Sequence, residues 1–133
     1  MPEVIIAMAI TAVALSGIIY GYISSAQRAE WSAYSMAAHS LAMQRLEQTR
    51  AAKWDPQAWP QVDELVATNF PDQVNILDIP VQLTNAVYAT NFTLIRDVST
   101  SPALKSIRVE CVWRFMERGL FTNTIVTYRA PDQ

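Results

Sequence analysis

The chain has 133 residues, of which 51% are apolar, and its formal net charge at pH 7 is −2. The length limits it to one domain beyond any membrane anchor. The charge provides no basic field for nucleic acid, and no cluster of Lys or Arg points to such a partner. The single cysteine, Cys111, excludes a disulfide within the chain but does not identify the compartment.

The first feature along the chain is an apolar run over residues 4–23, and no charged residue lies between Val4 and Gln27. As an α-helix, this run of 20 residues extends roughly 30 Å, about the hydrocarbon thickness of a bilayer. We therefore expect a transmembrane helix over about residues 4–23. A buried core helix is a second interpretation, but the rest of the chain is too small to wrap it. A cleaved signal ending near Ser24-Ser25-Ala26 is a third, although the run is long for a signal and no positive residue precedes it.

Residues 24–54 continue the helical pattern, because they contain no Gly or Pro and are rich in good helix formers. At about 100° per residue, one sector of this segment is apolar. Arg45 falls inside the sector, where its stem can pack while its head reaches water. Asp55-Pro56 ends the pattern, since the residue before a proline disfavours helix. The expected helix spans residues 1–54, and its apolar sector contains Trp31, Tyr34, Ala38, Leu41, Thr49 and Ala52.

Residues 55–78 change character, because prolines at positions 56, 60 and 71 interrupt them and another follows at 80. We expect a connector that packs on the long helix through Trp54 and Trp59. Its sequence QVDELVATNF, residues 61–70, is compatible with a short helix.

Residues 79–133 carry strand signals and form the predicted antiparallel sheet domain. The first strand is expected in residues 81–98, which are rich in Val, Thr, Tyr and Phe. Residues 105–117 alternate with a period of two, and Arg118-Gly119 supplies a turn into a strand over residues 120–130. The predicted fold class is α+β: a long N-terminal helix with a three- or four-stranded antiparallel sheet packed on its second half. One face of the alternating strand is predicted to be buried, with Ile107, Val109, Cys111, Trp113 and Phe115, and the other carries Arg108, Glu110, Val112 and Arg114.

Residues that could support catalysis or metal binding are sparse. His39 is the single histidine, so no Ser-His-Asp set and no His/Cys metal cluster can be assembled. We interpret His39 as a surface or interface residue and Cys111 as a buried, inert thiol. Asn91-Phe92-Thr93 is a glycosylation sequon by pattern, and we interpret Asn91 as a strand residue. The sequence predicts no enzyme, no cofactor and no metal site, and we interpret its scattered acids as solvated loop charges, namely Asp63, Glu64, Asp72, Asp78 and Asp97.

Three stretches carry a resemblance to a known family. PEVIIAMAITAVALSG, residues 2–17, resembles the N-terminal methylation motif of type IV pilins and of the pseudopilins of type II secretion. Glu3 matches the family's glutamate, and Pro2 matches the proline that often precedes it. SLAMQRLEQTRAAKW, residues 40–54, resembles the lower helix of the minor pseudopilins, and residues 107–132 are similar to that group's final hairpin.

The resemblance implies a minor structural subunit of a type II secretion pseudopilus or a type IV pilus, which assembles through its N-terminal helix. It implies that Glu3 is the subunit-docking residue, because its carboxylate would bind the free amine of an incoming subunit. A simpler interpretation places Glu3 at the first turn, where the helix dipole favours an acid. The implied partners are other pilin or pseudopilin subunits, an inner-membrane assembly platform, the prepilin peptidase that acts on the precursor, and membrane lipid.

The family also implies a leader ending in Gly and a first mature aromatic residue before Met1, so we expect that the chain starts at an internal methionine. Arg28, Arg45, Arg50 and Lys53 follow the span, and by themselves they would place the C-terminal domain in the cytoplasm. A basic leader reverses this expectation. The expected location is the bacterial inner membrane, single-pass, with the C-terminal domain in the periplasm and the subunit in a filament after assembly. The alternatives are a single-span adaptor that forms no filaments and, more distantly, a membrane-tethered enzyme.

Overall fold

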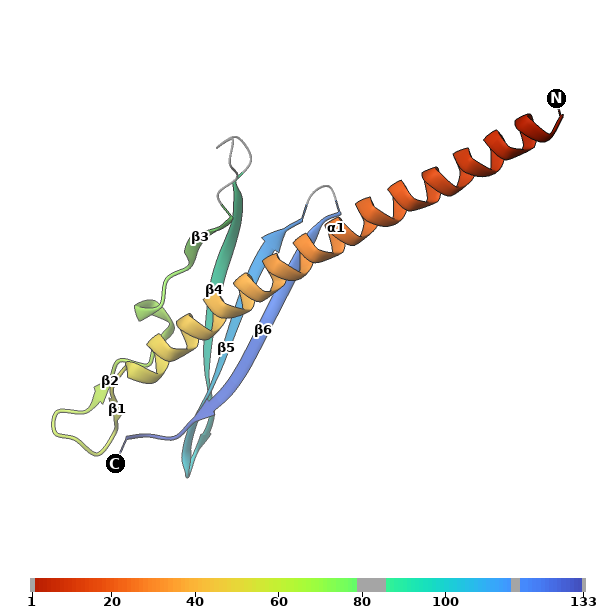
Figure 1. The fold of residues 1–133 in the computed structure, drawn as a ribbon. Coiled ribbons are helices and arrows are strands. Elements are labelled where there is room, and N and C mark those ends of the chain that lie inside the picture. The colour runs from red at the N-terminus through yellow and green to blue at the C-terminus, as the bar shows by residue number, and fades with distance from the viewer. Residues whose placement is uncertain (1, 79–85, 116–117, 133) are drawn as a thin grey trace. The chain divides into compact units, whose positions relative to one another are not determined.

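The computed structural model of the chain describes residues 2–78, 86–115 and 118–132. The fold is α+β, with a long N-terminal helix and a small antiparallel sheet packed on the second half of that helix, as the sequence predicts. Figure 1 labels these elements. In chain order they are α1 (Pro2–Ala51), β1 (Trp54–Asp55), β2 (Val62–Asp63), a 3-10 turn η1 (Ala67–Asn69), β3 (Gln73–Asp78), β4 (Val87–Thr100), β5 (Ala103–Arg114) and β6 (Leu120–Arg129).

The chain forms two compact units, residues 1–33 and residues 34–133, and the boundary between them falls inside α1. The first unit is helical throughout its described length, and none of the residues 2–33 is buried. This segment therefore has no core of its own. Its helix is supported by its own backbone hydrogen bonds.

The second unit contains the end of α1 and a four-stranded sheet with the order β3-β4-β5-β6, in which every pairing is antiparallel. Figure 1 shows α1 crossing the sheet over β4, β5 and β6. Val109 on β5 pairs with Thr93 on β4 and with Ile125 on β6, so these three side chains point to the same face. A separate pair of short strands, β1 and β2, lies after the helix.

The face of β5 predicted to be buried forms the centre of the core. Ile107, Val109, Cys111, Trp113 and Phe115 are all at most 1% exposed, which confirms the predicted alternation, although β5 itself ends one residue before Phe115. The opposite face is half-buried or exposed. The cluster is completed from α1 and the strands and connector around it, by Ala38, Ala42, Leu46, Trp54, Leu65, Phe70 and Ala89.

The helical stripe that meets this core matches the predicted sector in part. Its central residues are buried or half-buried as predicted, but Trp31 is 40% exposed. Trp31 belongs to the first unit, which ends at Ala33 and contains no buried residue among those described. Ala42 and Leu46 lie outside the predicted sector and are buried. The predicted members that pack on the sheet are Tyr34, Ala38, Leu41, Thr49 and Ala52.

Two boundaries differ from those predicted. The helix ends at Ala51 and not at residue 54, because the backbone of Lys53 exchanges hydrogen bonds with Glu64 and so opens the β1–β2 pair. The sheet begins at Gln73 rather than at residue 79, because β3 pairs with β4. A six-residue edge strand gives a weak local signal, and its existence depends on partner residues nine to eighteen positions further along the chain. The predicted strand over residues 81–98 is observed as β4, and its part up to residue 85 lies outside the described residues, as do residues 116–117 of the strand predicted over 105–117.

The two connector tryptophans have opposite surroundings. Trp54 is buried in the core, as predicted, but Trp59 is 97% exposed, so its predicted packing on the helix is wrong. The Asp55 side chain accepts hydrogen bonds from the backbone N–H groups of Gln57 and Ala58, both at 3.0 Å. This local turn directs the chain outward before Trp59 is reached. The short helix predicted in residues 61–70 is observed only as η1.

Candidate functional site

The apolar run predicted to span a membrane is a candidate membrane span by length and composition, the only one in the part of the chain that the structure describes. Every residue from Pro2 to Ile23 is exposed. Water tolerates scattered apolar side chains, but a contiguous apolar surface around a whole helix requires lipid or other protein. The large exposed side chains are Val4, Ile5, Ile6, Met8, Ile10, Val13, Leu15, Ile18, Ile19 and Ile23, together with Tyr20 and Tyr22.

Two polar side chains within this run, Thr11 and Ser16, are satisfied by the helix itself. The Thr11 hydroxyl donates to the Ala7 carbonyl and the Ser16 hydroxyl donates to the Ala12 carbonyl, both at 2.8 Å. A hydroxyl bonded one turn back does not have to seek water, so these residues are compatible with hydrocarbon. A Cβ atom added at Gly17 or Gly21 would meet nothing within 4 Å, so both glycines leave space for another helix.

Glu3, the predicted docking residue, lies in the first turn of α1 and is exposed. Among the described residues, no hydrogen bond or ion pair involves its carboxylate. The first turn also leaves backbone N–H groups without helical partners, and these favour an acid nearby. The carboxylate begins an otherwise mostly apolar strip on one side of the helix, formed by Val4, Ala7, Met8, Thr11, Ala12 and Leu15.

The second half of α1 is joined to the sheet by polar contacts as well as by its apolar stripe. Trp113 donates its indole N–H to the side-chain oxygen of Asn123 at 2.8 Å. The Asn123 amide in turn donates to the hydroxyl of Ser35 at 3.2 Å and to its carbonyl at 3.3 Å. These contacts connect β5, β6 and α1 in one chain. The Trp113 ring also stacks on Phe121 with a centroid distance of 5.1 Å.

Arg45 is the most buried cation on α1, with 4% of its surface exposed, so the expectation that its head reaches water is wrong. Its Nε donates to the Thr93 hydroxyl at 3.0 Å, and its Nη2 donates to the Pro71 carbonyl. The guanidinium also lies 5.4 Å from the centre of the Phe70 ring. Burial lowers the pKa of Arg45, and the Asp72 carboxylate partly offsets this effect. The side chain thus ties α1 to β4 and to the connector.

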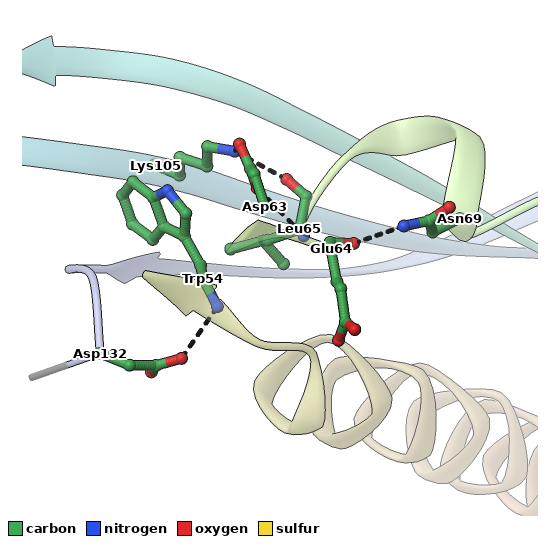
Figure 2. A network of polar contacts seen from close by, with 7 residues as sticks. All are labelled: Trp54, Asp63, Glu64, Leu65, Asn69, Lys105 and Asp132. Carbon is green, nitrogen blue, oxygen red and sulfur yellow. Dashed lines mark hydrogen bonds and ion pairs between the residues drawn. The ribbon is translucent and has the colours of Figure 1, made fainter. Parts of the chain in front are cut away.

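A second buried cation, Lys105 on β5, binds the first part of the connector. Figure 2 shows its Nζ between the Asp63 carboxylate, at 2.5 Å, and the Leu65 carbonyl, at 2.9 Å. The same nitrogen lies 4.9 Å from the centre of the Trp54 ring. A buried ammonium requires such partners, because its charge is expensive outside water. Asp63 therefore forms a structural ion pair, and its interpretation as a solvated loop charge is wrong.

The C-terminal residues Arg129 and Asp132 bind the end of α1 and the strand that follows it. Arg129 donates to the Thr49 carbonyl at 2.8 Å, which satisfies one of the carbonyls left open at the end of α1. Arg129 also donates to the Asp132 carboxylate at 2.7 Å. Asp132 accepts from the Trp54 backbone N–H at 2.9 Å, as Figure 2 shows, and its own N–H donates to the Trp54 carbonyl at 2.8 Å. The Trp54 hydrogen bond, followed by the one from Arg129, lowers the pKa of Asp132.

Three other residues considered from the sequence are His39, Cys111 and Asn91. His39 is exposed on α1. Cys111 is fully buried, and burial raises the pKa of its thiol to about 11, as expected for an unreactive cysteine. Asn91 is 2% exposed in β4, which confirms a strand residue whose amide donates to the Leu41 carbonyl at 3.4 Å. Within residues 2–78, 86–115 and 118–132, no three His, Cys, Asp or Glu side chains are grouped to hold a metal ion.

Comparison of the chain with protein-family models, with curated proteins and with solved structures finds no match. Functional inference therefore starts from the chain's own features. These are the exposed apolar half of α1 with Glu3 at its start, and the α+β domain with its polar contacts.

Proposed function

We propose that the protein is a minor pilin-like subunit of a type II secretion pseudopilus or a type IV pilus, and that it assembles through the first half of α1. The observation that carries this proposal is the exposed apolar helix over residues 4–23, which begins at a carboxylate with no described partner. The α+β domain built on the second half of the same helix supports it.

The role of Glu3 follows from the energetics of a charge beside lipid. An ionised carboxylate at a membrane edge is costly unless a partner neutralises it. In an assembling filament, the amine of an incoming subunit would provide that partner. The acid then sets the axial position of each subunit, while contacts between apolar helices provide most of the cohesion.

The proposal places the protein in the bacterial inner membrane with one span and with its C-terminal domain in the periplasm. Its partners are other pilin or pseudopilin subunits, an inner-membrane assembly platform and membrane lipid. The precursor is a substrate of a prepilin peptidase. The protein acts as a structural subunit and not as an enzyme.

A second candidate is a single-span adaptor whose domain binds a partner without forming filaments. The exposure of Trp59 favours this candidate, because Trp is enriched among the residues that dominate binding energy at interfaces. The Asp55 turn fixes the backbone just before this side chain. An adaptor has no need of Glu3, so a test of Glu3 separates the two candidates.

The test expresses the chain behind a cleavable pilin leader together with an assembly system. Glu3→Ala should leave membrane insertion and leader cleavage intact, because it makes the segment more apolar and the cleavage site lies upstream. Crosslinking between neighbouring subunits in sheared filaments should fall at least about tenfold, which corresponds to about 1.4 kcal/mol of lost docking energy. Glu3→Asp should be intermediate, because the charge remains on a shorter side chain.

Glu47→Ala is the matched control, because Glu47 is also an exposed acid on α1 but is paired with Arg50 at 2.7 Å. It should assemble like the unmodified chain. If Glu3→Ala assembles equally well, Glu3 acts only at the helix end and the docking role is wrong. If no variant and no unmodified chain enters a filament, the adaptor is the better account.

A further inference from the structure

The last strand of the sheet, β6, is a long edge strand without the usual protection. Residues 120–128 contain no charged residue and no proline. Its pairing with β5 runs from Leu120 to Arg129 with no bulge. Natural sheets block such edges with charges, prolines, bulges or covering segments, because the outer backbone groups are a template for another strand. Among the described residues, no backbone hydrogen bond outside the sheet involves Thr122–Tyr128.

The opposite edge of the sheet, β3, is also open and carries apolar residues. Val74 and Ile76 are 66% and 51% exposed. They lie on the outer face, away from α1, because Val74 continues the row in which Thr90 pairs with Val112 on the neighbouring strand. On β6, the same outer face carries Val126 and Tyr128, and both are exposed. Each edge therefore presents apolar side chains on the same face of the sheet.

The strand directions determine which edges can pair in parallel subunits. Three successive antiparallel pairings make β3 and β6 run in opposite directions. The described second half of α1 runs with β6, because Ser35 contacts Asn123 and Thr49 contacts Arg129. Pairing β6 with β3 of another copy keeps the two helices parallel and the pairing antiparallel. Antiparallel pairing of two β6 strands would point the helices in opposite directions.

We propose that β6 of one copy pairs antiparallel with β3 of a second copy of this chain, extending the sheet from subunit to subunit. Val126 and Tyr128 then meet Ile76 and Val74 across the junction, as apolar cross-strand pairs, when the second copy is displaced by about six residues, roughly 20 Å, along the strands. A contact between two different edges is heterologous, so it produces a ring or an open array rather than a two-fold dimer. The inference rests on the proposed function for the parallel arrangement of the helices and for the axial displacement between neighbouring subunits.

The test uses two full-length variants, Ile76→Cys and Val126→Cys, which are co-expressed behind a cleavable pilin leader with the assembly system and treated with a short bis-maleimide. Both positions are 51% exposed, so their labelling is matched. Cys111 does not compete, because it is fully buried. The mixture of the two variants should yield crosslinked dimers, and each variant by itself should yield none. Dimers from Val126→Cys by itself would indicate pairing of two β6 strands, and no dimers in the mixture would mean that the edges do not pair. Either result overturns the inference.

A charge on the edge provides an independent test. Thr124→Lys, placed in the Val126→Cys variant, should lower the crosslink yield about tenfold, because a lysine on an edge strand opposes pairing. Thr100→Lys is the control, because Thr100 is also exposed but lies on the central strand β4. Equal losses for both lysines would overturn the edge assignment. Crosslinking of an Ala7→Cys variant reports helix assembly separately, so this inference and the proposed function can fail independently.

Discussion

The two halves of α1 share one continuous helical backbone but differ in what surrounds their side chains. In residues 2–33, no side chain is buried, and apolar residues occupy every side of the helix. In residues 34–51, a stripe containing Ala38, Ala42 and Leu46 is fully or almost fully buried against the sheet. Both halves form the same backbone hydrogen bonds of one continuous helix, so helix formation by itself does not explain the difference.

The distribution of apolar surface does explain it. A helix that is apolar on one stripe belongs on the surface of a domain, whereas a helix that is apolar on all sides belongs in lipid or within other protein. Similar substitutions in the two halves should therefore have opposite consequences. The following predictions are arranged from the largest expected effect to the smallest.

The largest effect is expected where the second half of α1 meets the aromatic core. Trp113→Ala should lower the free energy of unfolding of a fragment over residues 25–133 by about 3–5 kcal/mol, because it removes a buried ring. Trp113 is 1% exposed and makes an edge contact with Tyr34 at 6.1 Å. The fragment retains every described buried residue, since the first of these is Ala38.

Arg114→Ala is the control for Trp113, because Arg114 is the next residue of β5 and points to the exposed face. It should change the free energy of unfolding by less than about 1 kcal/mol. Chemical denaturation followed by circular dichroism measures both variants. Similar midpoints for the two would mean that the sheet faces are assigned wrongly.

The next effect concerns the first half of α1. Val13→Lys should weaken membrane insertion by about 2.5–3.5 kcal/mol, because it places a charge at the centre of the span. Met36→Lys in the second half should insert normally, although Val13 and Met36 have similar exposures of 74% and 72%. Retention of each variant in the membrane after an alkaline wash measures the difference. Equal retention would contradict the membrane assignment of residues 4–23.

A smaller effect separates two arginines within the second half. Arg45→Ala should lower the free energy of unfolding by about 1.5–3 kcal/mol, because the Thr93 hydroxyl and the Pro71 carbonyl lose a buried charged donor. Arg50→Ala should cost no more than about 0.5 kcal/mol, since its bond to Glu47 is exposed. Thermal unfolding of the 25–133 fragment measures both. If both variants lose the same free energy of unfolding, the buried contacts of Arg45 stabilise the fold no more than the exposed pair of Arg50 does.

The smallest effect is a pH dependence at the end of the domain. The pKa of Asp132 is lowered in the folded chain, so this carboxylate stabilises the fold at pH values above its unfolded pKa of about 3.9. The stabilisation is lost as the pH falls through the lower, folded pKa. Asp132→Asn should therefore lower the melting temperature slightly at pH 7, and the difference from the unmodified chain should vanish in acid. A difference that persists at pH 2 would show that the side chain acts through packing instead.

The sequence by itself determines the features that depend on near neighbours along the chain. The span over residues 4–23 follows from composition, and the buried face of β5 follows from a period of two. The position of Glu3 at the edge of the apolar run is also a property of the sequence. Each of these signals is local, because a helix or strand repeats its side-chain direction within a few residues.

Only the tertiary structure decides the contacts between distant segments. It buries the head of Arg45 because Thr93 and Pro71 arrive from other elements, and it recruits Gln73–Asp78 into the sheet because β4 offers a partner. Trp54 and Trp59 have the same side chain in the same connector, yet the Lys105 and Asp132 contacts hold one inside while a local turn exposes the other. The residue type sets what a side chain can do, but its burial depends on partners far along the chain, which no local periodicity encodes.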